Sequence, residues 1–375
     1  MFVDEKRIIE TFTELVKIYS PPGKEKLLSD IIIEKLSVIN LNYMKDNFGN
    51  IIAKLPAKEG IEAPVIFFSA HLDVVEPCMN VMPVIEDLDG QLVIRSSGET
   101  VLGADDKAGL AMILEAITCV VERDMPHGDI ELILTLQEET GLVGAKNVDV
   151  ECLNSSFGYI LDHTASIGTA INRAPQHDNL SFTFKGKAAH AGLQPEEGIN
   201  AILLASKAIS KMPHGKLGDE TTANVGTIKG GHSTNIIPDE CVVTCEVRSH
   251  DQAKLNKYVE SYIEAANEAV DAFPGTTLKF SRDTEYKKIN IDPEEDLLMV
   301  AKKAAENIGI EFKTEATCGG SDANVLNYLG LKSVCLGCGY ENPHSTNEYI
   351  LVNNLVLGAE YVISIISTVI ETEEE

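Results

Sequence analysis

Apolar residues along the chain follow two spacings, one typical of helices and one of buried strands. Near the start, Ile8, Phe12 and Leu15 fall three or four positions apart, which predicts a helix ending at Ser20-Pro-Pro-Gly23. Further helices are predicted at residues 25–36 and 107–121, and strands at residues 51–55, 65–70, 131–136 and 159–161. Because strands alternate with helices, we predict an α/β fold with a mostly parallel sheet and helices on both faces.

The order of elements changes in the middle of the chain. Strands are predicted at residues 180–185, 223–228, 242–248 and 277–281, and helices at residues 198–211 and 252–272. This strand–helix–strand–strand–helix–strand order is that of a ferredoxin-like α+β sandwich. The α/β pattern returns after Asp292-Pro293 and ends in a helix at residues 352–370 and an acidic tail at residues 371–375. We therefore predict a discontinuous α/β domain, residues 1–173 and 288–375, interrupted by an inserted domain of residues 174–287.

The charge balance excludes several classes of partner. The chain has 31 Lys and Arg against 58 Asp and Glu, a formal net charge of −27, which argues against nucleic acid and anionic membranes as partners. The longest apolar stretches run about ten residues, roughly half of a membrane span, so no spanning segment is predicted. The amino terminus lacks a signal-peptide pattern, and the eight scattered cysteines fit a reducing cytoplasm.

Carboxylates and histidines gather where the predicted strands end. His71 and Asp73 follow one strand and point to the same side of an extended chain, although a solvated pair is equally common. The Glu138-Glu139 doublet follows another strand, where two glutamates are costly unless paired or metal-bound. Two further strands lead to the remaining candidates, Asp162 and His344. Because ligands bind at the carboxyl ends of strands in open α/β sheets, we expect these side chains to converge.

Asp105 and Asp106 open the predicted helix beside this group. Taken alone, they fit a helix cap and a first-turn charge as well as they fit a binding site. Together with the strand ends they supply two histidines and several carboxylates, which suit a pair of divalent cations sharing a carboxylate. The imidazoles favour zinc, although cobalt or manganese accept the same ligands. One carboxylate must stay free to take a proton from water, and the Glu138-Glu139 doublet offers a ligand and a base.

With these residues assembled, the sequence resembles the zinc-dependent exopeptidases of the peptidase T, carboxypeptidase G and aminoacylase superfamily, and peptidase T above all. The motifs that carry the resemblance span most of the chain: Ser69-Ala-His71-Leu-Asp73, Leu102-Gly-Ala-Asp-Asp-Lys-Ala-Gly109, Glu138-Glu139-Thr-Gly141, Leu161-Asp162, Ala189-His190-Ala-Gly192, Gly231-His-Ser-Thr-Asn235-Ile-Ile-Pro238, Gly319-Gly-Ser-Asp322 and Pro343-His344.

The resemblance implies a role for each candidate. His71, Asp105 and Asp162 would hold one zinc, and Asp105, Glu139 and His344 the other. Asp73 would orient His71, and Glu138 would be the general acid/base that activates a water bridging the metals. The family often has a cis peptide after the shared aspartate, which here would join Asp105 to Asp106.

The resemblance also makes the inserted domain a lid that forms a homodimer. In this role His190, often supplied by the partner subunit, would stabilise the oxyanion, and Asn235 and Arg248 would contact substrate. From the residues alone, a His190 bound to a backbone carbonyl and an Arg248 in a strand salt bridge remain open. The lid would close about hinges near Asn172 and Lys287.

The implied protein is a cytoplasmic enzyme that releases the amino-terminal residue of tripeptides. A di-metal amidohydrolase or carboxypeptidase acting on N-acyl amino acids or dipeptides is the main alternative, and the segment Asp162-His163-Thr164 departs from the peptidase T pattern. A serine hydrolase using Ser321 is a distant alternative, because Gly319-Gly-Ser-Asp-Ala323 only loosely matches a nucleophile elbow.

Overall fold

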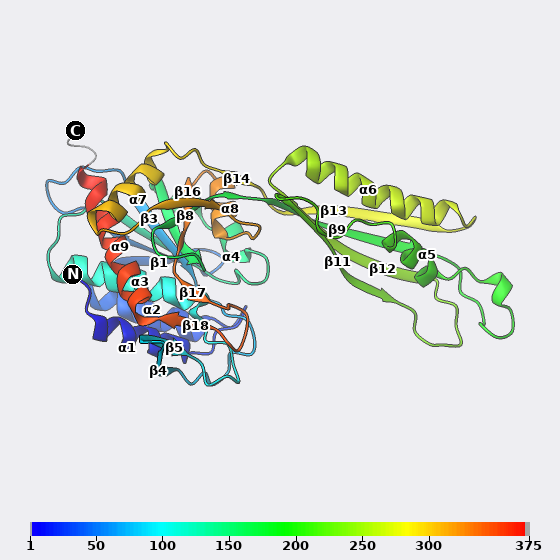
Figure 1. Cartoon of the computed structure of the whole chain (residues 1–375), viewed down its shortest axis with the longest axis horizontal. Helices are drawn as coiled ribbons and strands as arrows, with labels where there is room; N and C mark the ends of the chain where they lie inside the picture. The colour runs from blue at the N-terminus through cyan, green and yellow to red at the C-terminus, as the bar shows by residue number, and fades with distance from the viewer. Residues whose placement is uncertain (1, 372–375) are drawn as a thin grey trace. The chain divides into compact units, whose positions relative to one another are not determined.

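The computed structural model describes residues 2–371, which form two compact units (Figure 1). Unit 1 comprises Met1–Asn172, Asn290–Ala316 and Ser321–Glu375, and unit 2 comprises Arg173–Ile289 and Thr317–Gly320. Unit 2 therefore includes a short segment, Thr317–Gly320, that lies outside the predicted insert. Residues 372–375 of the predicted acidic tail lie outside the described residues.

Unit 1 is built around a mixed sheet. In spatial order its strands are β1 (Asn42–Lys45), β2 (Ile51–Leu55), β6 (Ile130–Thr135), β3 (Ile66–His71), β7 (Phe157–His163), β16 (Ser333–Gly337), β8 (Thr169–Ala174) and β14 (Ile289–Asn290), with β15 (Lys313–Ala316) paired to β8. The neighbouring strands β6, β3, β7 and β16 run parallel, and β2 and β8 flank them in antiparallel pairing. The predicted, mostly parallel sheet is therefore confirmed at its centre.

Both faces of this sheet are covered. Successive side chains of a strand point to opposite faces, and Phe67 and Phe68 on β3 are both fully buried. The helices of unit 1 are α1 (Glu5–Val16), α2 (Lys26–Val38), α3 (Ala104–Glu122), α4 (Val143–Lys146), α7 (Asp296–Asn307), α8 (Asp322–Tyr328) and α9 (Val352–Glu371). In one group, α3 packs on α1 and α9, and α9 also packs on α7; in another, α4 packs on α8 (Figure 1). Apolar burial on both faces explains why β3 and β6 are continuous apolar runs.

Helix α9 is long and apolar, yet it lies in the core of unit 1. Among the described residues, Val352–Ile370 is long and apolar enough to cross a membrane by length and composition, yet 72% of it is buried inside the unit. Its Gly358 lies so near α3 that a Cβ there would meet Met112 Sδ at 2.3 Å. Its Glu360 accepts a hydrogen bond from the Val3 backbone (2.8 Å). The apolar composition of α9 is thus explained by burial in the core.

A second, antiparallel sheet of unit 1 has the order β17 (Tyr340–Glu341), β18 (Tyr349–Leu351), β5 (Gln91–Arg95) and β4 (Val84–Leu88). Asp89 and Gly90 join β4 to β5 with φ angles of 52° and 83°, the left-handed pair that a tight hairpin requires. The loop between β17 and β18 carries His344. This sheet therefore places one of the candidate residues.

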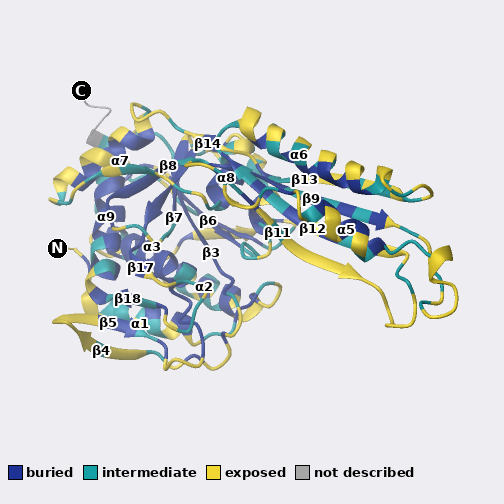
Figure 2. Ribbon diagram, turned by 45° about the vertical axis from the view of Figure 1, so that its right-hand side comes forward, coloured by how far each residue is buried: buried dark blue, intermediate teal, exposed yellow. Residues whose placement is uncertain are grey.

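Unit 2 is an antiparallel sheet with two helices on one face (Figure 2). Its strands lie in the order β10 (Gly215–Lys216), β11 (Thr221–Gly230), β12 (Glu240–Ser249), β9 (Gln176–Lys185) and β13 (Thr277–Tyr286), and its helices are α5 (Ala201–Ile209) and α6 (Gln252–Asp271). Side chains such as Phe182, Val243 and Tyr262 are fully buried between sheet and helices. The chain order β9-α5-β11-β12-α6-β13 is the predicted ferredoxin-like order.

Candidate metal centre and active site

The candidate residues of unit 1 lie at one edge of its parallel strands. His71 ends β3, Asp162 lies at the end of β7, and Glu138 and Glu139 follow β6. His344 lies in the loop after β17, and β17 itself follows β16 after two residues. Because β6, β3, β7 and β16 are parallel neighbours, their carboxyl ends share one edge. The convergence expected from the sequence is therefore present.

Asp105 reaches the same edge from the start of α3. Gly103 precedes the helix with a left-handed φ of 80°, and the peptide between Asp105 and Asp106 is cis, as expected. Farther along α3, a Cβ at Gly109 would meet the Leu161 carbonyl oxygen at 2.0 Å. Only glycine fits there, so α3 lies against β7 close to Asp162.

The carboxylates and imidazoles of the site form sets of potential metal ligands, and these sets share members. Ligand atoms of His71, Asp105 and Asp162 lie within 4.8 Å of one another, and so do those of Asp105, Glu139 and His344. His71 Nε2 is 3.1 Å from Asp105 Oδ1, and His344 Nε2 is 3.3 Å from Asp105 Oδ2. Asp105 therefore offers one oxygen to each group, which is the arrangement of a carboxylate shared by two cations. A further group, His71 with Glu138 and Glu139, includes the doublet.

Asp73 holds two parts of the site together. It is fully buried, and its two oxygens accept the backbone N–H groups of Glu138 (2.9 Å) and Glu139 (3.0 Å). Its Oδ1 also lies 3.5 Å from His71 Nδ1, which bonds the Asp73 carbonyl oxygen at 2.9 Å. With Nδ1 engaged in this way, Nε2 of His71 faces Asp105 and Asp162.

The electrostatics of the site favour bound cations. Burial raises the pKa of Glu138 and of Asp162 well above the ordinary carboxyl range. Hydrogen bonds to Asp105 and Glu139 raise the pKa of His344 to about 10. Burial alone would lower the pKa of His71, but hydrogen bonds to Asp105 and Asp73 hold it well above its usual value. The centre thus retains protons that divalent cations would displace, and its nitrogen and oxygen donors fit zinc-like ions.

Four further residues, Glu348, Tyr340, Thr135 and Asp322, support the site. Both oxygens of the buried Glu348 accept backbone N–H groups, from Gly103 (2.7 Å) and Asp105 (3.0 Å). The Tyr340 hydroxyl donates to Asp162 Oδ1 (3.1 Å), and the Thr135 hydroxyl donates to the buried Asp322. Asp322 lies in the Gly319–Asp322 motif, but no motif contains Glu348 or Tyr340, because only folding brings them to partners that are far away in the chain.

In unit 2, His190 and Asn235 lie together. His190 forms a β-bridge with Ile236, and the Ala191 N–H donates to the Asn235 carbonyl oxygen (3.0 Å). The exposed His190 ring is not held by a backbone carbonyl, since its Nδ1 accepts N–H groups from Gly192 and Leu193 (both 3.2 Å). An Nδ1 that accepts leaves the ring proton on Nε2, which is thus a hydrogen-bond donor.

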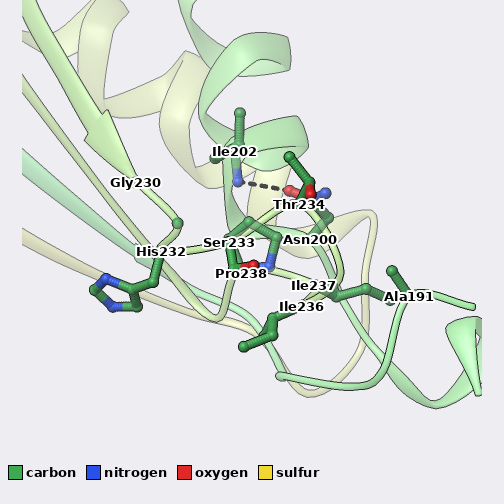
Figure 3. A pocket seen from close by; sticks show the side chains of 11 residues that line it. Ala191, Asn200, Ile202, Gly230, His232, Ser233, Thr234, Ile236, Ile237 and Pro238 are labelled. Carbon is green, nitrogen blue, oxygen red and sulfur yellow. Dashed lines mark hydrogen bonds between the residues drawn. The ribbon is translucent and has the colours of Figure 1, made fainter.

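A pocket of about 500 Å³ adjoins these residues and is lined by Asn200, His232, Ser233, Ile236 and Pro238, among others (Figure 3). Asn200 caps α5 by accepting the Ile202 N–H (2.9 Å). Asn235 accepts the Ser233 hydroxyl (2.6 Å). The Gly231–Pro238 motif thus forms part of the pocket wall.

Strand β12 begins at Glu240, just after the Gly231–Pro238 motif, whereas Arg248 lies near its other end. Arg248 is about eight residues from Glu240, which corresponds to roughly 26 Å along an extended strand. Its Nη2 forms a 3.0 Å salt bridge with Glu246, so the strand salt bridge left open by the sequence is present. Unit 2 brings His190 to Asn235 but does not bring Arg248 to them. Ser321, the serine alternative, is the N-cap residue of α8, and its backbone N–H donates to Asn324 (3.1 Å).

Two family models and several curated proteins match this chain. The M20 peptidase dimerisation domain model matches residues 177–274, and the peptidase family M28 model matches residues 50–184. The uncharacterized protein YqjE of Bacillus subtilis is 39% identical over 97% of this chain and 98% of its own length. Peptidase T of Bacillus subtilis is 28% identical over 96% of this chain and 98% of its own.

Solved structures are similar over nearly the whole chain. A tripeptidase from Staphylococcus aureus has a TM-score of 0.92 and 37% identity, covering 99% of this chain and 100% of its own. Aminopeptidase PepT from Bacillus cereus has a TM-score of 0.87 and 38% identity, covering 98% and 100%. A dinuclear metal-binding peptidase of the M20 family from Bacillus subtilis, 19% identical with a TM-score of 0.73 over 98% of both chains, shares the fold.

Replacing Glu348 by alanine is expected to weaken metal binding about 10- to 100-fold, because Asp105 loses the carboxylate that fixes its backbone. Titration of the metal-free protein with Zn²⁺ or Co²⁺, followed by calorimetry, measures this change. Glu341→Ala removes an exposed glutamate of the neighbouring strand β17 and should leave the affinity unchanged. Equal affinities for the two variants would contradict a supporting role for Glu348.

Proposed function

The chain belongs to the M20 family of peptidases, and we propose that it is an aminopeptidase that releases the first residue of tripeptides. The observation that carries this proposal is Asp105, which offers one oxygen to each of two ligand groups beside Glu138. Relatives named tripeptidase and PepT, 37% and 38% identical over nearly the whole chain, support the choice of substrate.

We assign the metal ligands from the two groups. His71, Asp105 and Asp162 would hold one cation, and Asp105, Glu139 and His344 the other. The two imidazole nitrogens favour zinc, and cobalt or manganese would accept the same donors. Two divalent cations bound by these residues would supply a Lewis acid for the scissile carbonyl and would lower the pKa of a water molecule toward neutrality.

Glu138 is assigned the proton transfers. Its backbone is fixed by Asp73, while its neighbour Glu139 is already engaged with His344 at 2.9 Å. Burial raises the pKa of Glu138 well above the ordinary carboxyl range, and a raised carboxyl pKa suits a group that accepts a proton and then gives it up. It would take the proton of the attacking water and pass it to the leaving amine. Asp73 would keep His71 oriented.

We further propose that the protein acts as a homodimer through unit 2. The short strand β10 pairs with Thr222 and Ala223 of β11, and beyond them the outer edge of β11 pairs with no other strand of the described chain. This edge carries the exposed Ile228, and exposed apolar edge strands favour pairing with another chain. The donor Nε2 of His190 would then stabilise the oxyanion in the partner's site.

The remaining roles follow from substrate chemistry and from the thiols. Arg248 would bind the free carboxylate of the peptide. Asn235, which lies beside His190, would bind the peptide backbone from the same side as His190, in the partner's site. All eight cysteines are free, which supports a reducing cytoplasm as the location.

A panel of dipeptides, tripeptides, tetrapeptides and N-acetyl amino acids tests the proposed activity. Tripeptides should be cleaved at their first bond with the highest kcat/KM, chelation should abolish cleavage, and Zn²⁺ or Co²⁺ should restore it. Preferred release of acetate from N-acetyl amino acids would favour a deacylase instead. Preferred cleavage of dipeptides or of carboxy-terminal residues would favour a carboxypeptidase.

Glu138→Gln should lose at least about 1000-fold in kcat while binding two metal equivalents, because the amide keeps the shape but cannot accept a proton. Turnover of the model tripeptide and metal content by atomic emission measure the two effects. Glu151→Gln, a change at a site outside the cluster, should behave as wild type. Activity retained by Glu138→Gln would refute its role as the base.

If His190 acts in trans, mixing inactive His190→Ala and Glu138→Gln subunits should restore about a quarter of wild-type activity. Half of the randomly paired dimers would be mixed, and each would have one complete site. Mixing His190→Ala with the double variant His190→Ala/Glu138→Gln should restore nothing. Absence of recovery in the first mixture, with subunit exchange verified, would place His190 in its own subunit's site.

A further inference from the structure

Arg248 belongs to a row of side chains across the sheet of unit 2. In the antiparallel register His177 on β9 pairs with Arg248 on β12 and with Tyr286 on β13. Directly paired residues point to the same face of a sheet, so the three side chains share one face. Glu246, two positions before Arg248 on β12, points to this face as well.

Only part of the Arg248 guanidinium is occupied by this row. Its Nη1 donates to the Tyr286 hydroxyl (3.3 Å), and its Nη2 donates to Glu246 Oε2 (3.0 Å). A guanidinium has five N–H groups, and the side chain is 28% exposed. The remaining terminal N–H groups are thus available to a carboxylate ligand.

Glu246 is fixed from a second side. His177 Nε2 lies 3.2 Å from Glu246 Oε2. Contacts with His177 and Arg248 lower the pKa of Glu246 to about 2, so it stays ionised near neutral pH. The His177 ring meets the Tyr286 ring edge-on, with centroids 5.2 Å apart. Each neighbour of Arg248 is therefore itself held by the row.

The segment Thr317–Gly320 packs against the ring of Tyr286 through Gly320. A Cβ at Gly320 would lie 2.2 Å from Tyr286 Cζ, so a side chain larger than hydrogen would displace the ring. The start of the segment is fixed by two hydrogen bonds of the Thr317 backbone. Its carbonyl oxygen accepts from His250 Nε2 (2.8 Å), and its N–H donates to the Arg173 carbonyl oxygen (3.0 Å). At the adjacent Gly319, a Cβ would meet only Thr317 Oγ1, at an ordinary 3.6 Å.

We infer that Tyr286 and Gly320 are positioning residues, which hold the Arg248 guanidinium so that it binds the free α-carboxylate of a peptide substrate. This inference rests on the proposed function. A long arginine side chain loses rotamer freedom when it binds a ligand, and a row that already fixes one of its orientations reduces that loss. The Tyr286 hydroxyl fixes Nη1, and the Gly320 backbone keeps the Tyr286 ring in place. Removal of either support should weaken carboxylate binding without changing the chemistry at the bond.

The test compares a tripeptide that has a free carboxyl terminus with the same tripeptide amidated. Tyr286→Phe and Gly320→Ala should each raise KM for the free acid about three- to tenfold. They should leave kcat within about twofold and KM for the amide unchanged. Arg248→Lys gives the full loss of the bidentate contact for reference. Matched controls are Tyr258→Phe, whose hydroxyl bonds Leu217 instead, and Gly319→Ala.

Equal changes in KM for the acid and the amide, or no change for either, would overturn the positioning role. If Gly320→Ala fails to fold, Tyr286→Phe decides, since it removes a single oxygen atom. Failure of the proposed function is distinguishable, because the metal-loaded wild-type protein would then cleave neither peptide. A wild-type protein that cleaves both peptides with the same KM would overturn the carboxylate site itself.

Discussion

The repulsion among carboxylates at one edge of the central sheet is the constraint on which the rest of unit 1 depends. Two carboxylates 4 Å apart repel by about 4 kcal/mol at an effective dielectric constant of 20, and Asp105, Glu138, Glu139 and Asp162 all lie at this edge. A fold that brings such groups together must fix them by other contacts. Asp73 and Glu348 do so by accepting backbone N–H groups on both of their oxygens. Bound cations would neutralise the charge that remains.

This constraint divides the acidic residues of the chain into two classes. A few of the 58 carboxylates meet at the candidate centre, where Asp73 is buried and the side chains of Asp105, Glu139 and Asp162 form hydrogen bonds. Many others lie on exposed strands and helices, in pairs such as Lys211 with Glu268. Exposed pairs of this kind contribute little to stability, whereas the net charge favours solubility. The excess of carboxylates argues against polyanionic partners, and the few carboxylates at the centre are the ones that would bind cations.

The sequence predicts those parts of the site that depend on local order. His71, Asp162 and the Glu138-Glu139 doublet could be found because each follows an apolar strand, and parallel strands bring such ends to one edge. Glu348 could not be found, because it lies 243 positions from Asp105 and acts through backbone groups that no motif records. The length and apolar composition of helix α9 are also not evident from the longest apolar run in the sequence. Its polar residues interrupt the apolar run, although the helix as a whole is apolar and buried.

The insertion of unit 2 also follows from the sheet of unit 1. The chain leaves this sheet along β8 and returns along β14, which are neighbours in the strand order. Asn172 joins the two paths, because its carbonyl oxygen accepts the Ile291 N–H (2.9 Å) and its side-chain amide donates to the Ile291 carbonyl oxygen (3.0 Å). Because the two ends of the inserted domain lie this close together, the domain can replace a short connection between β8 and β14 without distorting the sheet of unit 1. The ends of the insert therefore need no linker, and none rich in glycine, proline or serine occurs there.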